Sequence, residues 1–232
     1  MTTSGDTPIG SLIWSESPVT EIGVAHLPVP DLESLESALG GLDGKRILVR
    51  CDFNVPVRDG AISDDLRIKA ALPTLHWLSE RGATIAACTH FGRPQGVPDP
   101  KFSVQILRER INELAPGVEL LENLRFNQGE TENSAEFVRY LVGGADGQRF
   151  DGYVNDAFGA SHRSHASIVG PPVSLPSAAG RLLIKEVDVL ERLRSAPERP
   201  FVAVLGGAKV SDKLAVIESL MNVVDRLLFG GG

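Results

Sequence analysis

Cysteine is scarce in this sequence, and long apolar runs are missing. The 232 residues include two cysteines, Cys51 and Cys88, and both lie inside short apolar runs. This usage excludes a disulfide framework and favours buried, reduced thiols over a redox or metal role. No apolar stretch approaches the roughly 20 residues that a helix needs to span a bilayer. The N-terminus lacks the basic start and continuous apolar stretch of a signal peptide, so we expect a cytoplasmic protein with no membrane partner.

Positive charge is also in short supply. The chain has 23 Lys and Arg against 30 Asp and Glu, which gives a net charge of −7 at pH 7. Binding along a nucleic-acid backbone requires a surplus of basic side chains, so we expect no nucleic-acid partner. Any site for an anion must be built locally, from a few basic residues that the fold brings together.

From Lys45 onward the sequence repeats one unit: a short apolar run, a loop rich in Gly, Pro or charge, and a helical pattern. Short buried strands that alternate with helices predict an α/β fold in which a parallel sheet has helices on both faces. We predict strands at Arg46–Cys51, Thr84–Thr89, Val118–Leu121, Asp151–Asn155, Pro200–Leu205 and Arg226–Phe229. We predict helices at Asp64–Glu80 with Asp64 as the cap, Ser103–Leu114, Ser134–Val142, Arg181–Ser195 and up to Met221, with a short one at Leu32–Leu39.

The loops that follow four successive predicted strands carry similar polar chemistry. In such sheets, ligands bind outside the carboxyl ends of the strands. Arginine binds phosphate and carboxylate through paired hydrogen bonds, and we therefore predict a basic pocket for a small ligand that bears both groups. Taken singly, each arginine is also consistent with a surface salt bridge. The residues are Asp52 and Asn54, His90 and Arg93, Asn123 and Arg125, then Asp156, His162 and Arg163, with Arg67 one turn into the first helix.

The fourth of these loops is the most polar stretch of the chain, YVNDAFGASHRSHAS at residues 153–167. A plain surface loop is the simplest alternative for it. His162 and His165 have a spacing that some metal sites use, but Arg163 lies between them, and a cation is a poor neighbour for zinc. We assign no metal ligand and read the stretch as part of the anion pocket.

A different loop, GGAKVSDK, follows the strand predicted at Pro200–Leu205. It places two glycines and two lysines where a helix begins, so free backbone N–H groups and ammonium groups could hold the phosphates of a nucleotide. The pattern matches neither Gly-x-x-x-x-Gly-Lys-Ser/Thr nor Gly-x-Gly-x-x-Gly. A plain strand-to-helix turn therefore stays open as the alternative.

Seven segments, in order, resemble phosphoglycerate kinase: RCDFNVP, DLRIKAA, THFGRP, LLENLRF, YVNDAFGASHRSHAS, ERPFVAVLGGAKVSDK and the terminal FGGG. The resemblance runs from Lys45 to Gly232. It implies two Rossmann-like lobes joined by a helix, one for 3-phosphoglycerate and one for ATP or ADP with Mg. The implied reaction is reversible phosphoryl transfer between 1,3-bisphosphoglycerate and ADP, in glycolysis. It also implies a monomer.

Carried over motif by motif, the resemblance gives roles to individual residues. Arg67 and Lys209 would be catalytic, because phosphoryl transfer depends on positioning and on balancing charge. The implied nucleotide contacts are Gly207, Ala208, Lys209, Lys213 and Gly232. The implied phosphoglycerate contacts are Asp52, Phe53, Asn54, Arg67, His90, Phe91, Gly92, Arg93, Arg125 and Arg163.

The resemblance also implies domain boundaries and departures. We expect an N-terminal extension at 1–43, a phosphoglycerate lobe at 44–180, an interdomain helix at 181–198 and the start of a nucleotide lobe at 199–232. Cys51 and Phe91 replace an expected valine and leucine, and the segment between Leu114 and Leu120 is shorter than the family pattern. The family pattern also continues past the glycine triplet, so we expect the chain to be part of a longer protein, inactive by itself, with an incomplete second α/β lobe.

Two functions from other classes are alternatives to the kinase. A non-catalytic binder of phosphoglycerate would fit if 232 residues were the natural length. A nicotinamide-dependent oxidoreductase would need a glycine fingerprint after the first strand, which RCDFNVP does not supply.

Overall fold

The computed structural model describes residues 29–144, 147–206 and 214–230, and its main body is a five-stranded sheet in the order β5-β4-β1-β6-β7. All the pairs in this sheet are parallel. An α/β fold with a parallel sheet, as predicted, is therefore confirmed. The strands are β1 (Arg46–Arg50), β4 (Thr84–Cys88), β5 (Glu119–Leu120), β6 (Gly152–Asn155) and β7 (Ser177–Ala179).

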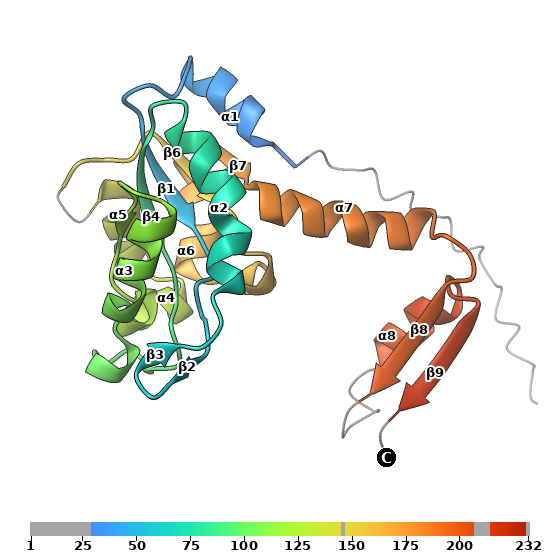
Figure 1. Ribbon diagram of the computed structural model, residues 1–232. Coiled ribbons are helices and arrows are strands. Elements are labelled where there is room, and N and C mark those ends of the chain that lie inside the picture. Colours follow the sequence, from blue (N-terminus) through green and yellow to red (C-terminus); the bar gives the residue numbers. More distant parts are fainter. Residues whose placement is uncertain (1–28, 145–146, 207–213, 231–232) are drawn as a thin grey trace, which may run out of the picture.

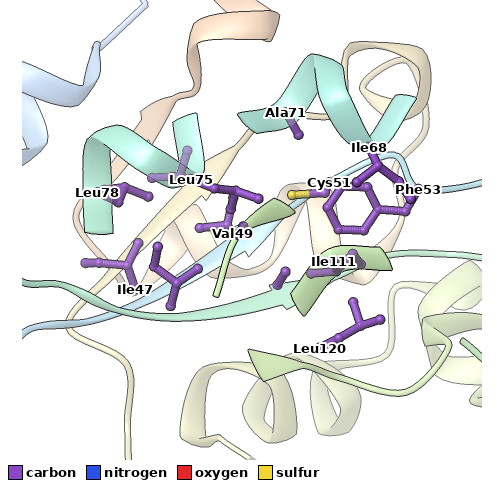
Figure 2. Packing of buried hydrophobic residues seen from close by; sticks show 14 of the residues in the cluster. Ile47, Val49, Cys51, Phe53, Ile68, Ala71, Leu75, Leu78, Ile111 and Leu120 are labelled. Carbon is purple, nitrogen blue, oxygen red and sulfur yellow. The ribbon is translucent and has the colours of Figure 1, made fainter. Parts of the chain in front are cut away.

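The central strand β1 contributes to the core on both faces of the sheet, because successive side chains of a strand point to opposite sides. Ile47 and Val49 belong to one hydrophobic cluster, whereas Leu48 belongs to another. The first cluster packs under α1 (Leu32–Leu39), α2 (Leu66–Ser79) and α3 (Gln105–Leu114), and Figure 2 shows Leu75 and Leu78 of α2 facing Ile47 and Val49. The second cluster packs under α5 (Ala135–Gly143) and α6 (Ala166–Val169). Helices thus cover both faces of the sheet.

Most predicted strands and helices agree with the structure within two residues at each end, but several short elements were not predicted. An antiparallel hairpin, β2 (Val57–Arg58) with β3 (Ala61–Ile62), lies in the loop after β1. The helices α4 (Gln128–Glu132) and α6 and the edge strand β7 were not predicted either. The other elements that were not predicted are the 3-10 turns η1 (Pro100–Phe102), η2 (Leu124–Phe126), η3 (Phe158–Ala160) and η4 (Pro171–Val173).

The predicted cap of the second helix was wrong by one residue. The N-cap of α2 is Asp65, and its side chain does not bond to the helix N-terminus. Asp64 precedes it and its Oδ1 accepts a hydrogen bond from Leu66 N at 2.8 Å. Asp65 instead forms ion pairs with Lys69 and with Arg110 of α3. The sequence alone does not distinguish Asp64 from Asp65 as the cap, because an aspartate at either position can accept a hydrogen bond from the backbone N–H two residues on.

The described part of the N-terminal segment belongs to the main body. Helix α1 begins at the cap Asp31, whose side chain accepts from Ser34 N, and ends at Gly40, which has a φ of 68°. Leu32 and Leu35 are fully buried in the same cluster as β1 and α2. The packed core therefore includes residues that precede the lobe boundary predicted at 44.

A second, smaller unit follows the long helix α7 (Arg181–Ser195). It consists of the parallel pair β8 (Val202–Gly206) and β9 (Arg226–Gly230) with α8 (Leu214–Met221) between them in sequence. Figure 1 shows α7 running from the edge of the five-stranded body to this unit. Among the described helices, none is both long and apolar enough to cross a bilayer.

Candidate functional site

A pocket of about 610 Å³ opens at the carboxyl edge of the five-stranded sheet. The chain passes from β1 to β4 on one side and later returns to β6 on the other, so the strand order reverses at β1, where ligands bind in sheets of this kind. Eight of the ten residues predicted to contact phosphoglycerate line this basic pocket. They are Asp52, Asn54, Arg67, His90, Gly92, Arg93, Arg125 and Arg163.

Arg67 lies on the first turn of α2 at the rim of the basic pocket. Its Nη1 is 2.6 Å from Asp52 Oδ2, and its side chain is 53% exposed. The Asp52 side chain is 16% exposed, so only the arginine of this pair is open to solvent. Because the Arg67 side chain is the exposed partner, its guanidinium can turn toward a more highly charged anion at the rim.

Gly92 joins two walls of the pocket. Its backbone N–H donates to Asn54 Oδ1 at 2.9 Å, and its carbonyl accepts from Arg125 Nη1 at 2.9 Å. Gly92 has a φ of +61°, and a Cβ at this position would lie 2.3 Å from the Phe102 ring. The loop after β4 thus requires glycine here, both for its backbone angle and for space.

Arg125 is the most constrained cation of the pocket. Its Nε is buried without a hydrogen-bond partner among the described residues. Burial lowers the pKa of the Arg125 guanidinium, and the nearby guanidinium groups of Arg163 and Arg50 lower it further. Cations brought this close together, with a donor left unpaired, favour the binding of an anion between them.

His90 is held in one tautomer by a buried arginine. Arg50 Nη2 lies 3.2 Å from His90 Nδ1, and because a guanidinium can only donate, Nδ1 must accept and the ring proton must sit on Nε2. Burial, reinforced by the positive charges of Arg50 and Arg125, lowers the pKa of His90 to about 3. His90 therefore offers the pocket a neutral N–H donor.

Sequence reasoning missed the buried side chains that support this pocket. Arg50, the last residue of β1, is 1% exposed, and Glu130 and Ser167 are fully buried. His165 lines the pocket beside them, although we had placed it only in the polar stretch. A charged residue directly after the apolar run at 47–49 was the one signal available, because such a charge is seldom buried without a partner.

Two predicted contact residues do not face the pocket. The side chains of Phe53 and Phe91 belong to the hydrophobic cluster beneath α2, and neither lines the basic pocket. Their type explains the placement, because an aromatic side chain flanked by polar residues alternates toward the core. Contact of Phe53 and Phe91 with the substrate stays a prediction, and the structure leaves only their backbone groups to make it.

Two of the three remaining polar residues of the strand exits have structural roles. Asn123 accepts from Phe91 N at 3.1 Å and donates to Phe91 O at 2.7 Å, so it fastens two loops together. Asp156 Oδ1 accepts from Leu182 N at 2.9 Å, at the start of α7. His162 is exposed and is not among the residues that line the pocket.

The predicted nucleotide contacts lie outside the described residues. These are Gly207, Ala208, Lys209, Lys213 and Gly232. Within residues 29–144, 147–206 and 214–230, no group of three or more His, Cys, Asp and Glu side chains is placed to hold a metal ion. The described residues therefore give no cage for Mg.

Both cysteines are buried, and burial raises the pKa of Cys51 and raises that of Cys88 to about 12. Both thiols are therefore kept protonated within the core.

The chain matches the family model of phosphoglycerate kinase over residues 38–119 and 106–232. The two matched stretches overlap at 106–119, near the segment that we expected to be short. The structure keeps β5 paired with β4 directly after this segment, so the sheet is continuous there.

Curated relatives and solved structures agree with the family model. The chain is 50% identical over 213 residues to phosphoglycerate kinase from Rubrobacter xylanophilus, covering 82% of this chain and 53% of the relative. It is 49% identical over 215 residues to the enzyme from Salinispora arenicola, covering 82% and 54%. The structure of phosphoglycerate kinase from Coxiella burnetii aligns with a TM-score of 0.76 at 34% identity, covering 88% of this chain and 55% of that one. The chain spans about half the length of the curated relatives that it matches, and by these matches it belongs to the phosphoglycerate kinase family.

Proposed function

We propose that this chain supplies the acyl-phosphate side of phosphoglycerate kinase, the reversible phosphoryl transfer between 1,3-bisphosphoglycerate and ADP that gives 3-phosphoglycerate and ATP. The observation that carries the proposal is the convergence of Arg67, Arg93, Arg125 and Arg163 on one pocket at the sheet edge. The ligand bears a phosphate at one end and a carboxylate, or its acyl phosphate, at the other. Guanidinium groups suit both ends.

The residues of the basic pocket offer the ligand two kinds of hydrogen-bond donor, charged and neutral. Arg125 is half-buried and Arg163 is exposed, and their charges lie close enough to interact, so both can offer charge-assisted hydrogen bonds to the phosphate. Asn54 and the neutral Nε2–H of His90 give the ligand donors that add no charge. Together they fix the ligand in one orientation. Positioning of this kind matters for phosphoryl transfer, because the protein forms no covalent bond to the substrate and acts mainly by orienting it and stabilising charge.

Arg67 is proposed as the catalytic residue. In the forward direction the bond between the carboxyl oxygen and phosphorus breaks, and a bond forms from the same phosphorus to the β-phosphate oxygen of ADP. Negative charge on the transferring group must be balanced as this happens. Arg67 sits at the pocket rim beside α7, where Leu182 and Glu186 also line a neighbouring cavity, so its guanidinium can reach a group that arrives from the linker side.

The nucleotide side of the proposal rests on sequence. Gly207, Ala208, Lys209, Lys213 and Gly232 are proposed to contact ATP or ADP, with Lys209 also contacting the transferring phosphoryl. Mg would enter with the nucleotide and offset phosphate charge. We further propose residues 181–198 as the interdomain helix that carries the nucleotide lobe toward the pocket, in a monomeric cytoplasmic enzyme.

Calorimetric titration of residues 1–232 with 3-phosphoglycerate tests the proposal. We expect saturable binding at one site that weakens as salt is raised, because the contacts are ionic. Absence of binding, or binding indifferent to salt, would contradict the proposed pocket.

Replacing Arg163 by alanine is expected to weaken 3-phosphoglycerate binding by roughly 10- to 100-fold, the equivalent of one charge-assisted hydrogen bond. Arg163 is exposed at the pocket wall, so the fold should be unaffected. Arg139→Ala, an exposed arginine on α5 outside the pocket, is the matched control. Equal affinities for the two variants would show that Arg163 does not contact the ligand.

His90 should make the protein less stable in acid. Its folded pKa of about 3 lies below the ordinary histidine value of 6.5, so the unfolded chain binds the proton more readily. The contribution of His90 to stability is therefore complete above pH 6.5 and is lost progressively as the pH falls toward 3. Urea unfolding between pH 7 and pH 4 should give a shallower loss for His90→Gln than for the wild type, with His162→Gln as the matched control. Parallel profiles for His90→Gln and the wild type would refute this account.

A further inference from the structure

A fully buried carboxylate lies beneath the basic pocket. Glu130 is on α4, 0% exposed, and does not itself line the pocket. Its Oε2 accepts from Ser167 N at 2.9 Å, and its Oε1 accepts from Ser167 Oγ at 2.6 Å. A buried charge is costly unless it is paired and hydrogen-bonded. These contacts join α4 to α6.

The contacts of Glu130 continue to the pocket through Ser167. Arg50 Nε donates to Ser167 Oγ at 3.0 Å, and Arg50 Nη2 donates to His90 Nδ1 at 3.2 Å. Arg50 Nη1 also donates to Cys51 O. The guanidinium that fixes the His90 tautomer is thus fixed in turn by the hydroxyl that Glu130 holds.

A second contact from Glu130 reaches the pocket directly. Glu130 Oε1 lies 3.6 Å from His165 Nδ1, and His165 is a pocket-lining residue. Burial lowers the pKa of His165 and the arginines at positions 125, 163 and 50 lower it too, whereas the charge of Glu130 raises it. His90 also faces this group, since the two imidazoles interact. Among these charged neighbours, Glu130 alone favours an imidazolium at position 165.

We propose that Glu130 is a positioning residue of the basic pocket, which positions His90 through Ser167 and Arg50 and positions His165 through its charge, 3.6 Å from Nδ1. Glu130 does not touch the ligand. It offsets the charge of Arg50, so that a basic pocket can be built over a buried arginine, and it sets the orientation of two of the pocket's imidazoles. The inference rests on the proposed function only for its ligand, 3-phosphoglycerate.

The experiment compares wild type, Glu130→Gln and Glu132→Gln over residues 1–232. Glu132 is an exposed residue of the same helix and provides the matched control. We expect calorimetry to give an affinity for 3-phosphoglycerate about tenfold weaker in Glu130→Gln and unchanged in Glu132→Gln. Unchanged affinity in a folded Glu130→Gln protein would overturn the inference.

Histidine NMR gives a readout that a merely structural role would not move and that needs no ligand. Long-range proton–nitrogen spectra report the tautomer of His90 and the titration of His165. In Glu130→Gln we expect the pKa of His165 to fall, because the negative charge that raised it is gone, and His90 to lose its single Nε2–H tautomer. If both are as in the wild type, Glu130 does not position them.

Ser167→Ala keeps the test decisive if Glu130→Gln does not fold. This change removes only the hydroxyl between Glu130 and Arg50, and we expect several-fold weaker binding and the same loss of the His90 tautomer. Wild-type affinity and spectra in this variant would overturn the route through Ser167. If the wild type itself fails to bind 3-phosphoglycerate, the proposed ligand is wrong, and the spectra still decide the role of Glu130.

Discussion

Replacing Arg67 by alanine is expected to lower kcat about a thousandfold, the size of effect seen when a charge-stabilising group is removed from a phosphoryl-transfer or oxyanion site. In the resting structure the Arg67 guanidinium is paired with Asp52 at 2.6 Å and is half exposed. It is therefore free to contact the transferring phosphoryl, which is the most charged group at the rim. The change should affect kcat more than KM, because Arg67 acts on charge that moves in the transition state.

The measurement requires a nucleotide lobe of family length, since this chain spans about half of its relatives. We would join residues 1–232 to the C-terminal remainder of the Rubrobacter xylanophilus enzyme and assay ATP-dependent turnover of 3-phosphoglycerate. Cys51→Val is the control, because this buried thiol packs in the core and does not line the basic pocket. Comparable kcat values for the Arg67 and Cys51 variants would mean that the catalytic residue is misassigned.

Gly180→Ala is expected to destabilise the protein by roughly 3 kcal/mol, within the range of changes that force a clash in a packed interior. An added Cβ would lie 2.2 Å from Asp156 Oδ1 and 2.7 Å from Asp156 Cβ. That carboxylate is buried, and its Oδ1 accepts from Leu182 N and Leu183 N at the start of α7. The new methyl group would push the carboxylate out of this cap, and the first turn of α7 would lose its acceptor.

Urea unfolding of Gly180→Ala, with Gly143→Ala as a matched control, tests this prediction. Gly143 is at the end of α5, and a Cβ there meets nothing within 4 Å. Alanine at position 143 should be neutral or stabilising by about 0.5 kcal/mol, because it restricts the unfolded chain. Similar midpoints for the two variants would contradict the clash with Asp156.

The elements that the sequence predicts well are those whose pattern is set by burial on both faces. Residues 47–49 are all apolar because β1 lies at the centre of the sheet, with a paired strand on each side. Helix α7 was predicted at both ends because its amphipathic pattern is long. By contrast, α1 has only eight residues. A pattern that short does not tell a docked helix from an extension, so its burial against the sheet was missed.

The candidate site divides in the same way. The arginines at strand exits could be predicted, because parallel strands bring their carboxyl ends to one edge. The supports behind them could not, since Glu130 meets Ser167 across 37 residues of sequence and Arg50 meets it across 117. Those contacts arise from the packing of α4 and α6 on the sheet, for which local sequence gives no signal. Phe53 and Phe91 show a different limit: the motifs that contain them are at the site, but their side chains are buried in the core.

The central claim is that the four strand exits form one phosphoglycerate site. A crystal structure of residues 1–232 with bound 3-phosphoglycerate tests it most directly. We predict ligand density within the basic pocket, with the phosphate within hydrogen-bond distance of Arg125 and Arg163 and the carboxylate directed toward the rim at Arg67. Ligand density elsewhere, with the basic pocket holding none, would contradict the account.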